Sequence, residues 1–407
     1  MPAWTGVWRW FPPGEGWARS AREALHRGSG VTRNCSGAGK ERDCDVSGKR
    51  KRLRSGFTTG ACAAAAAKGA AMALLTGRVV ESVEIPFPSG DRHAFRLHSC
   101  CCQDGQVSAS VIKDAGDDPD VTNGAEIIAI VEQADPLQEQ AEPVVLRGGP
   151  GVGRVTKPGL PVAVGEPAIN PVPRRMIREA VAEAVAAGGG DAVSLVVTVC
   201  VTDGEVLAEK TLNSRLGILG GLSILGTTGI VRPISAKAWT DTIDASMKVA
   251  RAAGLREVIL STGRTSEAAL EGVVDLPEEA RVMMGDYLAY ALKAAKRHGF
   301  SRIHLAGMWA KILKCALGIP QTHVRHGALE VQQAADLLAG LGLDAETCRD
   351  LARANTAREI YQRLREAGRG DIIHAVCVRA REYARRRSGL AVTVYLVTSE
   401  DGIVEQV

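Results

Sequence analysis

Residues 217–229 constrain what this chain can fold into more than any other part of the sequence. These thirteen residues include five glycines, five Ile or Leu residues and no charge. Glycine permits left-handed backbone conformations and close approaches that other residues resist, at an entropic cost to folding. The Ile and Leu side chains distinguish the segment from a flexible Gly/Ser linker. We therefore expect a buried glycine-rich loop. Two explanations of the glycines stay open: close contact with a flat or anionic ligand, or a turn between two domains.

The first 54 residues differ in composition from the rest. They hold twelve Lys or Arg against five Asp or Glu, and four of the six tryptophans, whereas the other residues hold 38 basic and 41 acidic side chains. We interpret residues 1–54 as a basic, Trp-rich, disordered extension; a membrane-surface or nucleic-acid-binding arm is the alternative. The rest has no basic excess, so we do not expect it to bind nucleic acid. It is long enough for two domains, which we place at 55–233 and 234–407.

The pattern of residues 55–233 predicts a mixed α+β domain. Thr58 or Thr59 can cap a helix over 61–76 whose face is almost entirely alanine, and Gly77 can end it. Apolar residues alternate between positions 83 and 111, which is typical of antiparallel strands. A second helix is expected over 174–187, followed by an apolar strand over 193–201. The alanine face indicates that another element packs very close to the first helix.

After position 233 the sequence repeats a strand, a short glycine turn and a helix. Strands are predicted over 257–260, 302–305 and 390–397, and helices over 236–253, 286–297, 309–317 and much of 327–386. This alternation is typical of a parallel α/β sheet. We therefore expect a Rossmann-like, three-layer α/β domain, and an α/β fold class for the chain. Residues 261–264 follow a strand at the edge where such sheets bind ligands.

The ten cysteines show no metal-finger spacing, and we predict no protein-bound metal. Isolated cysteines of this kind behave as small hydrophobic residues. We find no convincing signal peptide and no apolar run of the ~18–20 residues that a membrane span needs. A cytoplasmic location fits best.

Two further loops carry candidate chemistry. Residues 147–154 have the glycines of a dinucleotide fingerprint but not its spacing, and prolines follow where a helix should open. We interpret them as a ligand-facing loop in which Arg154 and Lys157 receive carboxylates. Residues 113–120 hold four aspartates, although an EF-hand spacing is not met. A cation-binding loop and a plain acidic turn both stay open, and crowding is expected to raise the pKa of at least one carboxyl.

Six blocks together resemble one family in order along the chain. They lie at 54–68, 113–122, 148–156, 165–174, 220–235 and 307–323. The chain from 54 to 407 resembles the CbiD family, the cobalt-precorrin-5B C1-methyltransferases of anaerobic cobalamin biosynthesis. The resemblance implies an enzyme that moves a methyl group from S-adenosylmethionine to carbon 1 of a cobalt-containing tetrapyrrole, giving cobalt-precorrin-6A. It implies no nucleic-acid or membrane partner and leaves a homo-oligomer open.

With this resemblance we assign candidate site residues. Asp117 and Asp118 are the candidate catalytic carboxylates. The candidates for binding S-adenosylmethionine are Gly220, Gly221, Ser223, Gly226, Thr227, Ser261, Gly263 and Arg264. The candidates for binding the tetrapyrrole are Thr58, Thr59, Lys68, Gly149, Gly151, Gly153, Arg154, Lys157, Asn170, Arg174, Lys311 and His323. Arginine forks suit the acetate and propionate groups of such a ring. Which loops take which ligand stays open, and we expect the ligand in the cleft between the two domains.

The chain departs from the family pattern at two positions, with Asn123 where the family has histidine and Ala310 before Lys311 where it has glycine. Two rival functions are an α/β enzyme for a phosphorylated substrate and a non-catalytic protein that binds tetrapyrrole or nucleic acid. The chain has neither the Walker lysine nor the Gly-X-Gly-X-X-Gly turn before a helix that an enzyme for a phosphorylated substrate would use. Nucleic-acid binding would have to come from residues 1–54.

Overall fold

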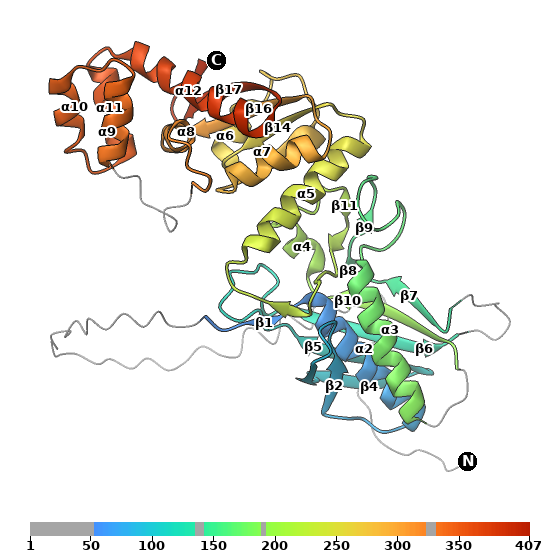
Figure 1. Ribbon diagram of the computed structural model, residues 1–407. Helices are drawn as coiled ribbons and strands as arrows, with labels where there is room; N and C mark the ends of the chain where they lie inside the picture. Colours follow the sequence, from blue (N-terminus) through green and yellow to red (C-terminus); the bar gives the residue numbers. More distant parts are fainter. Residues whose placement is uncertain (1–52, 135–141, 189–192, 323–330) are drawn as a thin grey trace, which may run out of the picture. The chain divides into compact units, whose positions relative to one another are not determined.

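The structure is a computed structural model that describes residues 53–134, 142–188, 193–322 and 331–407 (Figure 1). Leu53–Val407 forms one compact unit. The predicted extension over 1–54, apart from its last two residues, and the candidate ligand His323 lie outside the described residues. The division into domains at position 233 stays a prediction.

The first sheet has five strands and is mixed. Its order is β4 (Ser99–Gln103), β5 (Gln106–Ile112), β6 (Glu126–Gln133), β10 (Leu195–Val201) and β7 (Val144–Gly148). Neighbours are antiparallel except β10 and β7, which run parallel. The hairpin of β2 (Ser82–Pro86) and β3 (Arg92–Arg96) pairs separately. The predicted antiparallel strands are confirmed, whereas β4, β6 and β7 were not predicted.

Two helices pack side by side against this sheet, α2 (Thr59–Thr76) and α3 (Pro171–Ala187) (Figure 1). The predicted cap is confirmed: the Thr58 side chain accepts from the Ala61 amide, and Gly77 ends the helix in the left-handed region. The alanines from Ala63 to Ala67 are fully buried, which explains the alanine face: α3 and the sheet approach from two sides. Within the described residues α2 alone is long and apolar enough to cross a membrane, but 72% of it is buried inside the protein, as in a core helix.

The second sheet also has five strands. Its order is β15 (Arg281–Met283), β14 (Glu257–Ser261), β16 (Arg302–Met308), β17 (Ala391–Thr398) and β18 (Gly402–Gln406). The first four strands are parallel, and β18 is antiparallel. The predicted parallel α/β pattern is confirmed. Strand β14 lies between β15 and β16. The chain therefore runs from β14 to β15 on one side and then crosses to β16 on the other side of β14.

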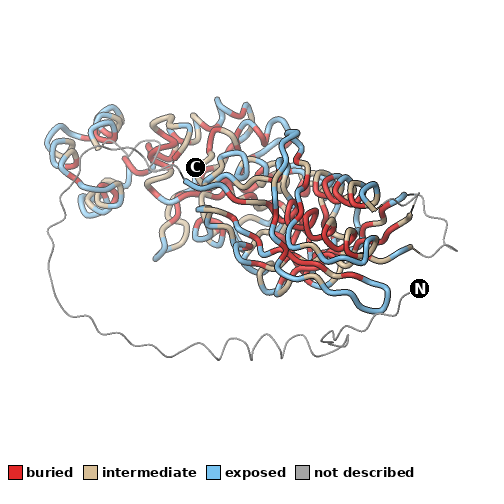
Figure 2. Tube along the Cα trace, turned by 90° about the horizontal axis from the view of Figure 1, so that it is seen from below, coloured by how far each residue is buried: buried red, intermediate tan, exposed pale blue. Residues whose placement is uncertain are grey.

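Helices cover the two faces of this sheet unequally. Its helices are α5 (Ala236–Ala252), α6 (Arg264–Ala268), α7 (Leu288–Arg297), α8 (Trp309–Ala316), α9 (Val331–Gly340), α10 (Ala345–Leu351), α11 (Ala357–Glu366) and α12 (Gly370–Ser388). One face packs Val258, Leu260 and Leu305 against the larger helices. The other buries Ile259 and Ala306 mainly under Leu270, which follows α6. Figure 2 shows that buried and exposed stretches alternate along the chain. The second helical layer of the expected three-layer domain is therefore thin.

Candidate functional site

The glycine-rich segment 217–229 is held along its length by backbone pairing. Three two-residue pairs involve it or its flank: β11 (Ile218–Leu219) with β9 (Arg154–Val155), β12 (Gly221–Leu222) with β8 (Gly151–Val152), and β13 (Ile230–Val231) with β1 (Gly56–Phe57). Between them, the Gly60 amide donates to the Leu225 carbonyl at 3.1 Å, and the Ile224 amide donates to Ala168 at 2.8 Å. The structure thus brings four of the six sequence blocks together around this segment.

Most of the glycines assigned to ligand binding are explained by this packing. A Cβ at Gly151 would lie 2.0 Å from the Val201 carbonyl oxygen, and one at Gly221 would lie 2.4 Å from the Gly151 carbonyl. Comparable contacts meet a Cβ at Gly149, Gly153 and Gly226. At distances below 3.0 Å the neighbouring atoms would have to shift, so these positions favour glycine because the protein itself approaches closely. Gly220 and Gly263 differ, since a Cβ at either would meet nothing within 4 Å.

The polar residues assigned to this region have structural partners. The Thr59 hydroxyl accepts from the Leu225 amide at 3.0 Å, and Ser223 donates to Asn213 at 3.4 Å. The Asn170 amide donates to the Ile224 carbonyl at 3.0 Å. Lys68 lies on α2 and pairs with Glu183 of α3 at 2.5 Å. Thr227, like Gly220, is exposed. Of the assigned residues on segment 217–229, Gly220 and Thr227 therefore present the most surface to a ligand.

The acidic loop 113–120 binds other parts of the chain through its carboxylates. Asp117 accepts from the Arg54 amide at 2.7 Å, and Asp118 accepts from the Ile234 amide at 2.8 Å. Lys113 is 2% exposed and pairs with Asp120 at 2.6 Å. Asp118 thereby fixes Ile234, which has a left-handed φ of 57°. Both candidate catalytic carboxylates thus have a structural role as hydrogen-bond acceptors.

Two of these carboxyls, Asp114 and Asp120, have a lowered pKa, so the expected rise does not occur at them. The hydrogen bond from Arg54 holds the pKa of Asp114 below its ordinary value. Burial acts to raise the pKa of Asp120, but the charge and hydrogen bonds of Lys113 and Thr122 outweigh it, and the pKa is lowered. Crowding does not dominate at Asp114 and Asp120 because each of these two carboxylates has a cationic partner.

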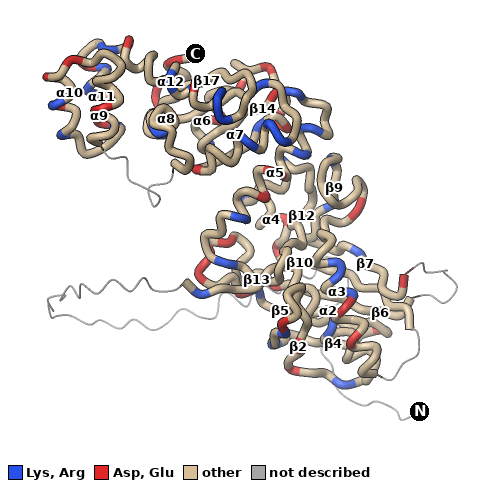
Figure 3. The backbone as a smooth tube through the Cα atoms, viewed as in Figure 1, with Lys and Arg blue, Asp and Glu red and all other residues tan. Residues whose placement is uncertain are grey.

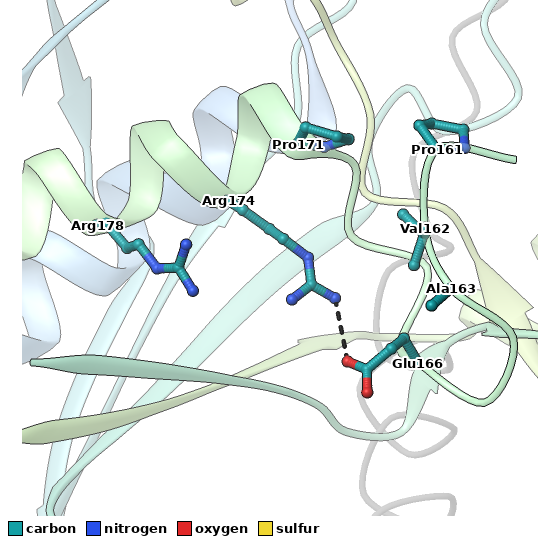
Figure 4. A pocket seen from close by; sticks show the side chains of 7 residues that line it. All are labelled: Pro161, Val162, Ala163, Glu166, Pro171, Arg174 and Arg178. Atoms are coloured by element: carbon teal, nitrogen blue, oxygen red, sulfur yellow. Dashed lines mark ion pairs between the residues drawn. The ribbon is translucent and has the colours of Figure 1, made fainter. Parts of the chain in front are cut away.

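A pocket beside α3 collects two arginines (Figure 4). Its lining residues are Pro161, Val162, Ala163, Glu166, Pro171, Arg174 and Arg178. Arg174 donates to the Ile169 carbonyl at 2.8 Å and lies 3.5 Å from Glu166, while Arg178 pairs with Glu142. In Figure 4 both guanidinium groups project from α3 toward the same space, with Glu166 facing Arg174. Arg154 and Lys157 have other partners, the Gly165 carbonyl and Glu279 (2.8 Å). The pocket is chemically suited to a carboxylate.

Residues 261–264 lie at the carboxyl end of β14, as predicted. Ser261 donates to one oxygen of buried Glu267 at 3.1 Å, and Arg215 pairs with the other at 2.5 Å. Arg215 lies two residues before segment 217–229, so this carboxylate connects both groups of assigned cofactor residues. Arg264 is exposed and follows Gly263, the open glycine. Backbone amides at such a turn can receive an anionic or polar ligand group.

Lys311 lies on α8, next to the carboxyl end of β16. Its ammonium pairs with Asp286, which also accepts from the Thr322 hydroxyl at 2.8 Å. The Lys314 ammonium donates to the Thr322 carbonyl at 2.9 Å. Burial, followed by the charge of Lys311, lowers the pKa of Lys314. Sequence reasoning missed Asp286 and Arg178, although Arg178 follows Arg174 by one helical turn and Asp286 follows a strand.

The described residues contain no group of three His, Cys, Asp or Glu side chains that could hold a metal ion. Cys62, Cys200, Cys315 and Cys377 are free and buried, as expected of small hydrophobic residues. Burial raises the pKa of Cys62 to about 12. Basic and acidic residues are interspersed in Figure 3, in keeping with the absence of a basic excess after position 54. The region therefore offers arginines and open glycine turns rather than a metal centre.

Two family models match the chain. The model described as CbiD covers residues 46–233, and the model described as CbiD, C-terminal domain, covers residues 321–407. The matches include the acidic loop, the arginine pocket and segment 217–229. They therefore agree with the blocks that carry the resemblance.

Relatives extend this likeness over most of the chain. The cobalt-precorrin-5B C(1)-methyltransferase of Desulfotalea psychrophila is 55% identical over 359 residues, which cover 87% of this chain and 98% of that protein. The protein of the same name from Geobacter metallireducens is 54% identical over 83% of this chain and 93% of its own length. A crystal structure of the cobalamin biosynthesis protein CbiD from Archaeoglobus fulgidus is 25% identical over 78% of this chain and 85% of that chain, with a TM-score of 0.36.

Proposed function

This chain belongs to the CbiD family and is a C-methyltransferase of cobalamin biosynthesis, and from that premise we propose its reaction. It transfers the methyl group of S-adenosylmethionine to carbon 1 of cobalt-precorrin-5B and releases cobalt-precorrin-6A. The observation that carries the proposal is the 55% identity over 98% of a relative with the corresponding name. We place the enzyme in the cytoplasm.

The arginine pocket supports a role in holding the substrate. The substrate is a large ring with acetate and propionate groups, and its carboxylates call for forked cationic donors. Arg174 and Arg178 supply two such donors from one helix. Glu166 lies 3.5 Å from Arg174, so a carboxylate of the ring can exchange with it. We assign this pocket to a carboxylate arm of the ring.

The turn after β14 fits S-adenosylmethionine. Gly263 has open space where a Cβ would lie, and Ser261 is fixed beneath it by Glu267. When bound, the sulfonium compound supplies an electrophilic methyl group. Transfer of such a group depends on in-line positioning more than on acid–base chemistry. The protein contributes fixed loops that hold both reactants, and the buried Arg215–Glu267 pair is one such support.

One carboxylate, Asp117 or Asp118, has a second, chemical role in this proposal: it accepts the proton lost from the ring or stabilises the sulfonium. The variants Asp118→Asn and Asp118→Ala separate the two roles. Asparagine keeps an acceptor for the Ile234 amide but is no base, whereas alanine removes both functions. We expect Asp118→Asn to keep its thermal stability and to lose turnover. Full turnover in Asp118→Asn would exclude Asp118 as the base.

The reaction is tested with purified protein, cobalt-precorrin-5B and S-adenosylmethionine carrying a labelled methyl group. We expect one labelled methyl on the ring and one equivalent of S-adenosylhomocysteine. Isothermal titration with S-adenosylhomocysteine separates this function from an enzyme for a phosphorylated substrate, which has no reason to bind it. Binding of the ring without label transfer would instead support a non-catalytic tetrapyrrole-binding protein.

A further inference from the structure

The topology of the second sheet identifies where a nucleoside can bind. In open α/β sheets ligands lie outside the carboxyl ends of the strands, where the strand order reverses. Here that point is at β14, because β15 follows it on one side and β16 on the other. Gly263, with its open surroundings, lies in the turn that leaves β14. The inference that follows rests on the proposed use of S-adenosylmethionine.

Asp286 occupies the position expected of a ribose acceptor. In dinucleotide-binding sheets an acidic residue about 20 residues after the glycine turn, beyond the neighbouring strand, accepts from a ribose hydroxyl. Asp286 lies 23 residues after Gly263 and three residues beyond β15, the neighbour of β14. Its carboxylate already accepts from Thr322 and Lys311. A carboxylate offers about four lone-pair directions, so a ribose hydroxyl can share it.

An aromatic pair includes Tyr287, which directly follows Asp286 in the chain. Trp239 of α5 is 42% exposed, and its ring stacks on Tyr287 with centroids 6.3 Å apart and planes inclined by 26°. The Trp239 ring also lies over Gly285, where an added Cβ would be 3.4 Å from it. A large aromatic surface left open beside a polar acceptor suits a flat base with a hydroxylated sugar.

We propose that Trp239, Tyr287 and Asp286 form the adenosine subsite for S-adenosylmethionine, with the base against the Trp239–Tyr287 pair and the ribose on Asp286. The remainder of the ligand extends toward the open turn at Gly263 and Arg264.

The test compares two probes by isothermal titration on the full chain. S-adenosylhomocysteine carries the whole ligand, whereas 5′-methylthioadenosine carries only the adenosine part. Because stacking of one base contributes about 1–3 kcal/mol, we expect Trp239→Ala to weaken both probes by the same factor, about tenfold or more. Arg264→Ala should weaken S-adenosylhomocysteine alone. Val206→Ala, which truncates an exposed side chain on the short helix α4 (Gly204–Ala208), is the control and should leave both affinities unchanged.

Tryptophan fluorescence and a ligand with a modified sugar give two results that a purely structural role of Trp239 or Asp286 would not produce. Either probe should quench tryptophan emission in the wild type, whereas Trp239→Phe should keep the affinity and lose the quench. Asp286→Asn should weaken 5′-methylthioadenosine but not its 2′,3′-dideoxy analogue, with thermal unfolding as the check on folding.

The outcomes distinguish the subsite from the reaction. If the wild type binds S-adenosylhomocysteine and the Trp239 variants show the same affinity and the same quench, the subsite is overturned and the proposed reaction stands. No binding by the wild type would overturn both. If the tetrapyrrole quenches the Trp239 emission and neither adenosine probe does, the aromatic pair belongs to the ring site instead.

Discussion

Gly220 and Gly221 are neighbours in the chain, yet a side chain at each would meet different surroundings. Both have positive φ, 76° and 154°, but only Gly221 lies against another backbone, that of Gly151. At the scale of single residues, the same contrast divides the glycines into two kinds. Other parts of the chain pack against the first kind, and the second kind leaves room for a ligand. Ligand contact is therefore more plausible at Gly220 and Gly263 than at their neighbours.

The substitutions Gly221→Ala and Gly220→Ala test this contrast. The new methyl at 221 would lie 2.4 Å from the Gly151 carbonyl, which cannot move without breaking the β8–β12 pair. We expect Gly221→Ala to lower the free energy of unfolding by about 3 kcal/mol or more, and Gly220→Ala by about 1 kcal/mol from backbone strain alone. Urea unfolding measures both. Equal losses would contradict the packing explanation.

Truncation of Arg178 tests whether the arginine pocket holds the substrate. It removes one cationic donor from the pocket and one ion pair with Glu142. We expect Arg178→Ala to raise KM for the tetrapyrrole about tenfold with little change in kcat, because a charge-assisted hydrogen bond contributes roughly 1.5–3 kcal/mol. Arg175→Ala is the control: Arg175 is exposed on the same helix and pairs only loosely with Glu179, at 3.8 Å. Equal effects of the two variants would remove the pocket from the site.

Glu183 gives a prediction about acid stability. It accepts from Arg92 at 2.8 and 2.9 Å and from Lys68 at 2.5 Å. The Arg92 hydrogen bonds, against the opposing effect of burial and with help from Lys68, lower the pKa of Glu183 to about 2. A lowered folded-state pKa contributes stability that is fully present above the ordinary value near 4.5 and is lost as the pH falls toward 2.

We therefore expect Glu183→Gln to be less stable than the wild type by about 1 kcal/mol at pH 7, because the pair is partly screened by solvent. The two proteins should converge as the pH falls from 4.5 to 2. Chemical unfolding at several pH values measures the difference. Glu179→Gln on the same helix should give no such convergence, and a constant difference at all pH values would rule out the ion pairs as its cause.

At the scale of elements, α2 shows how composition and packing are linked. The helix fits between α3 and the first sheet because its central side chains are methyl groups. Local signals set its ends, since Thr58 caps it and Gly77 stops it. Its stability comes from close contact on nearly all sides rather than from one apolar stripe. Lys68 is the half-buried exception, and its ammonium is matched by Glu183.

An enlarged side chain in the middle of α2 should therefore be costly. Ala65 is fully buried, and leucine there would force α3 or the sheet to move. We expect Ala65→Leu to lower the free energy of unfolding by about 1–3 kcal/mol. Met72→Leu, at a half-buried position of the same helix, keeps the volume and should be nearly neutral. A denaturation midpoint unchanged by Ala65→Leu would show that the helix has space around it.

At the scale of the whole molecule, the first family model and the compact unit begin at nearly the same residue. The compact unit is Leu53–Val407, and the first family model begins at residue 46. The Desulfotalea relative matches 98% of its own length while covering 87% of this chain. We therefore expect methyl transfer to need nothing before about position 46.

Deletion of residues 1–45 should leave kcat, KM and the melting temperature of the enzyme unchanged. The physical reason is that the strands, helices and core clusters that hold the candidate site in place lie within residues 53–407. Steady-state kinetics and thermal unfolding of the two forms measure this. Binding of nucleic acid by the full chain but not by the truncated form would restore the alternative that residues 1–54 are a binding arm. A loss of turnover would contradict the assignment of the activity to the remainder.

Strong local signals made much of the fold predictable. Helix 61–76 had its cap and stop, and the repeat of strand, glycine turn and helix after position 233 predicted the parallel sheet. Strand β4 gave no such signal, because Ser99–Gln103 contains three consecutive cysteines and becomes a strand only by pairing with β5. Strand β6 did carry an alternating pattern at Ile127, Ala129 and Val131, which the sequence reasoning passed over.

The sequence by itself determined the family, the parallel α/β pattern and the candidate loops, because motif order, periodicity and caps are properties of neighbouring residues. Only the tertiary structure decided what segment 217–229 approaches. Most of its glycines lie against distant parts of the chain, and the carboxylates of Asp117 and Asp118 hold distant amides. The partners in these contacts lie tens of residues away or more, so no local pattern could reveal them. For the same reason the pairing of Lys68 with Glu183 and of Trp239 with Tyr287 emerged only from the folded chain.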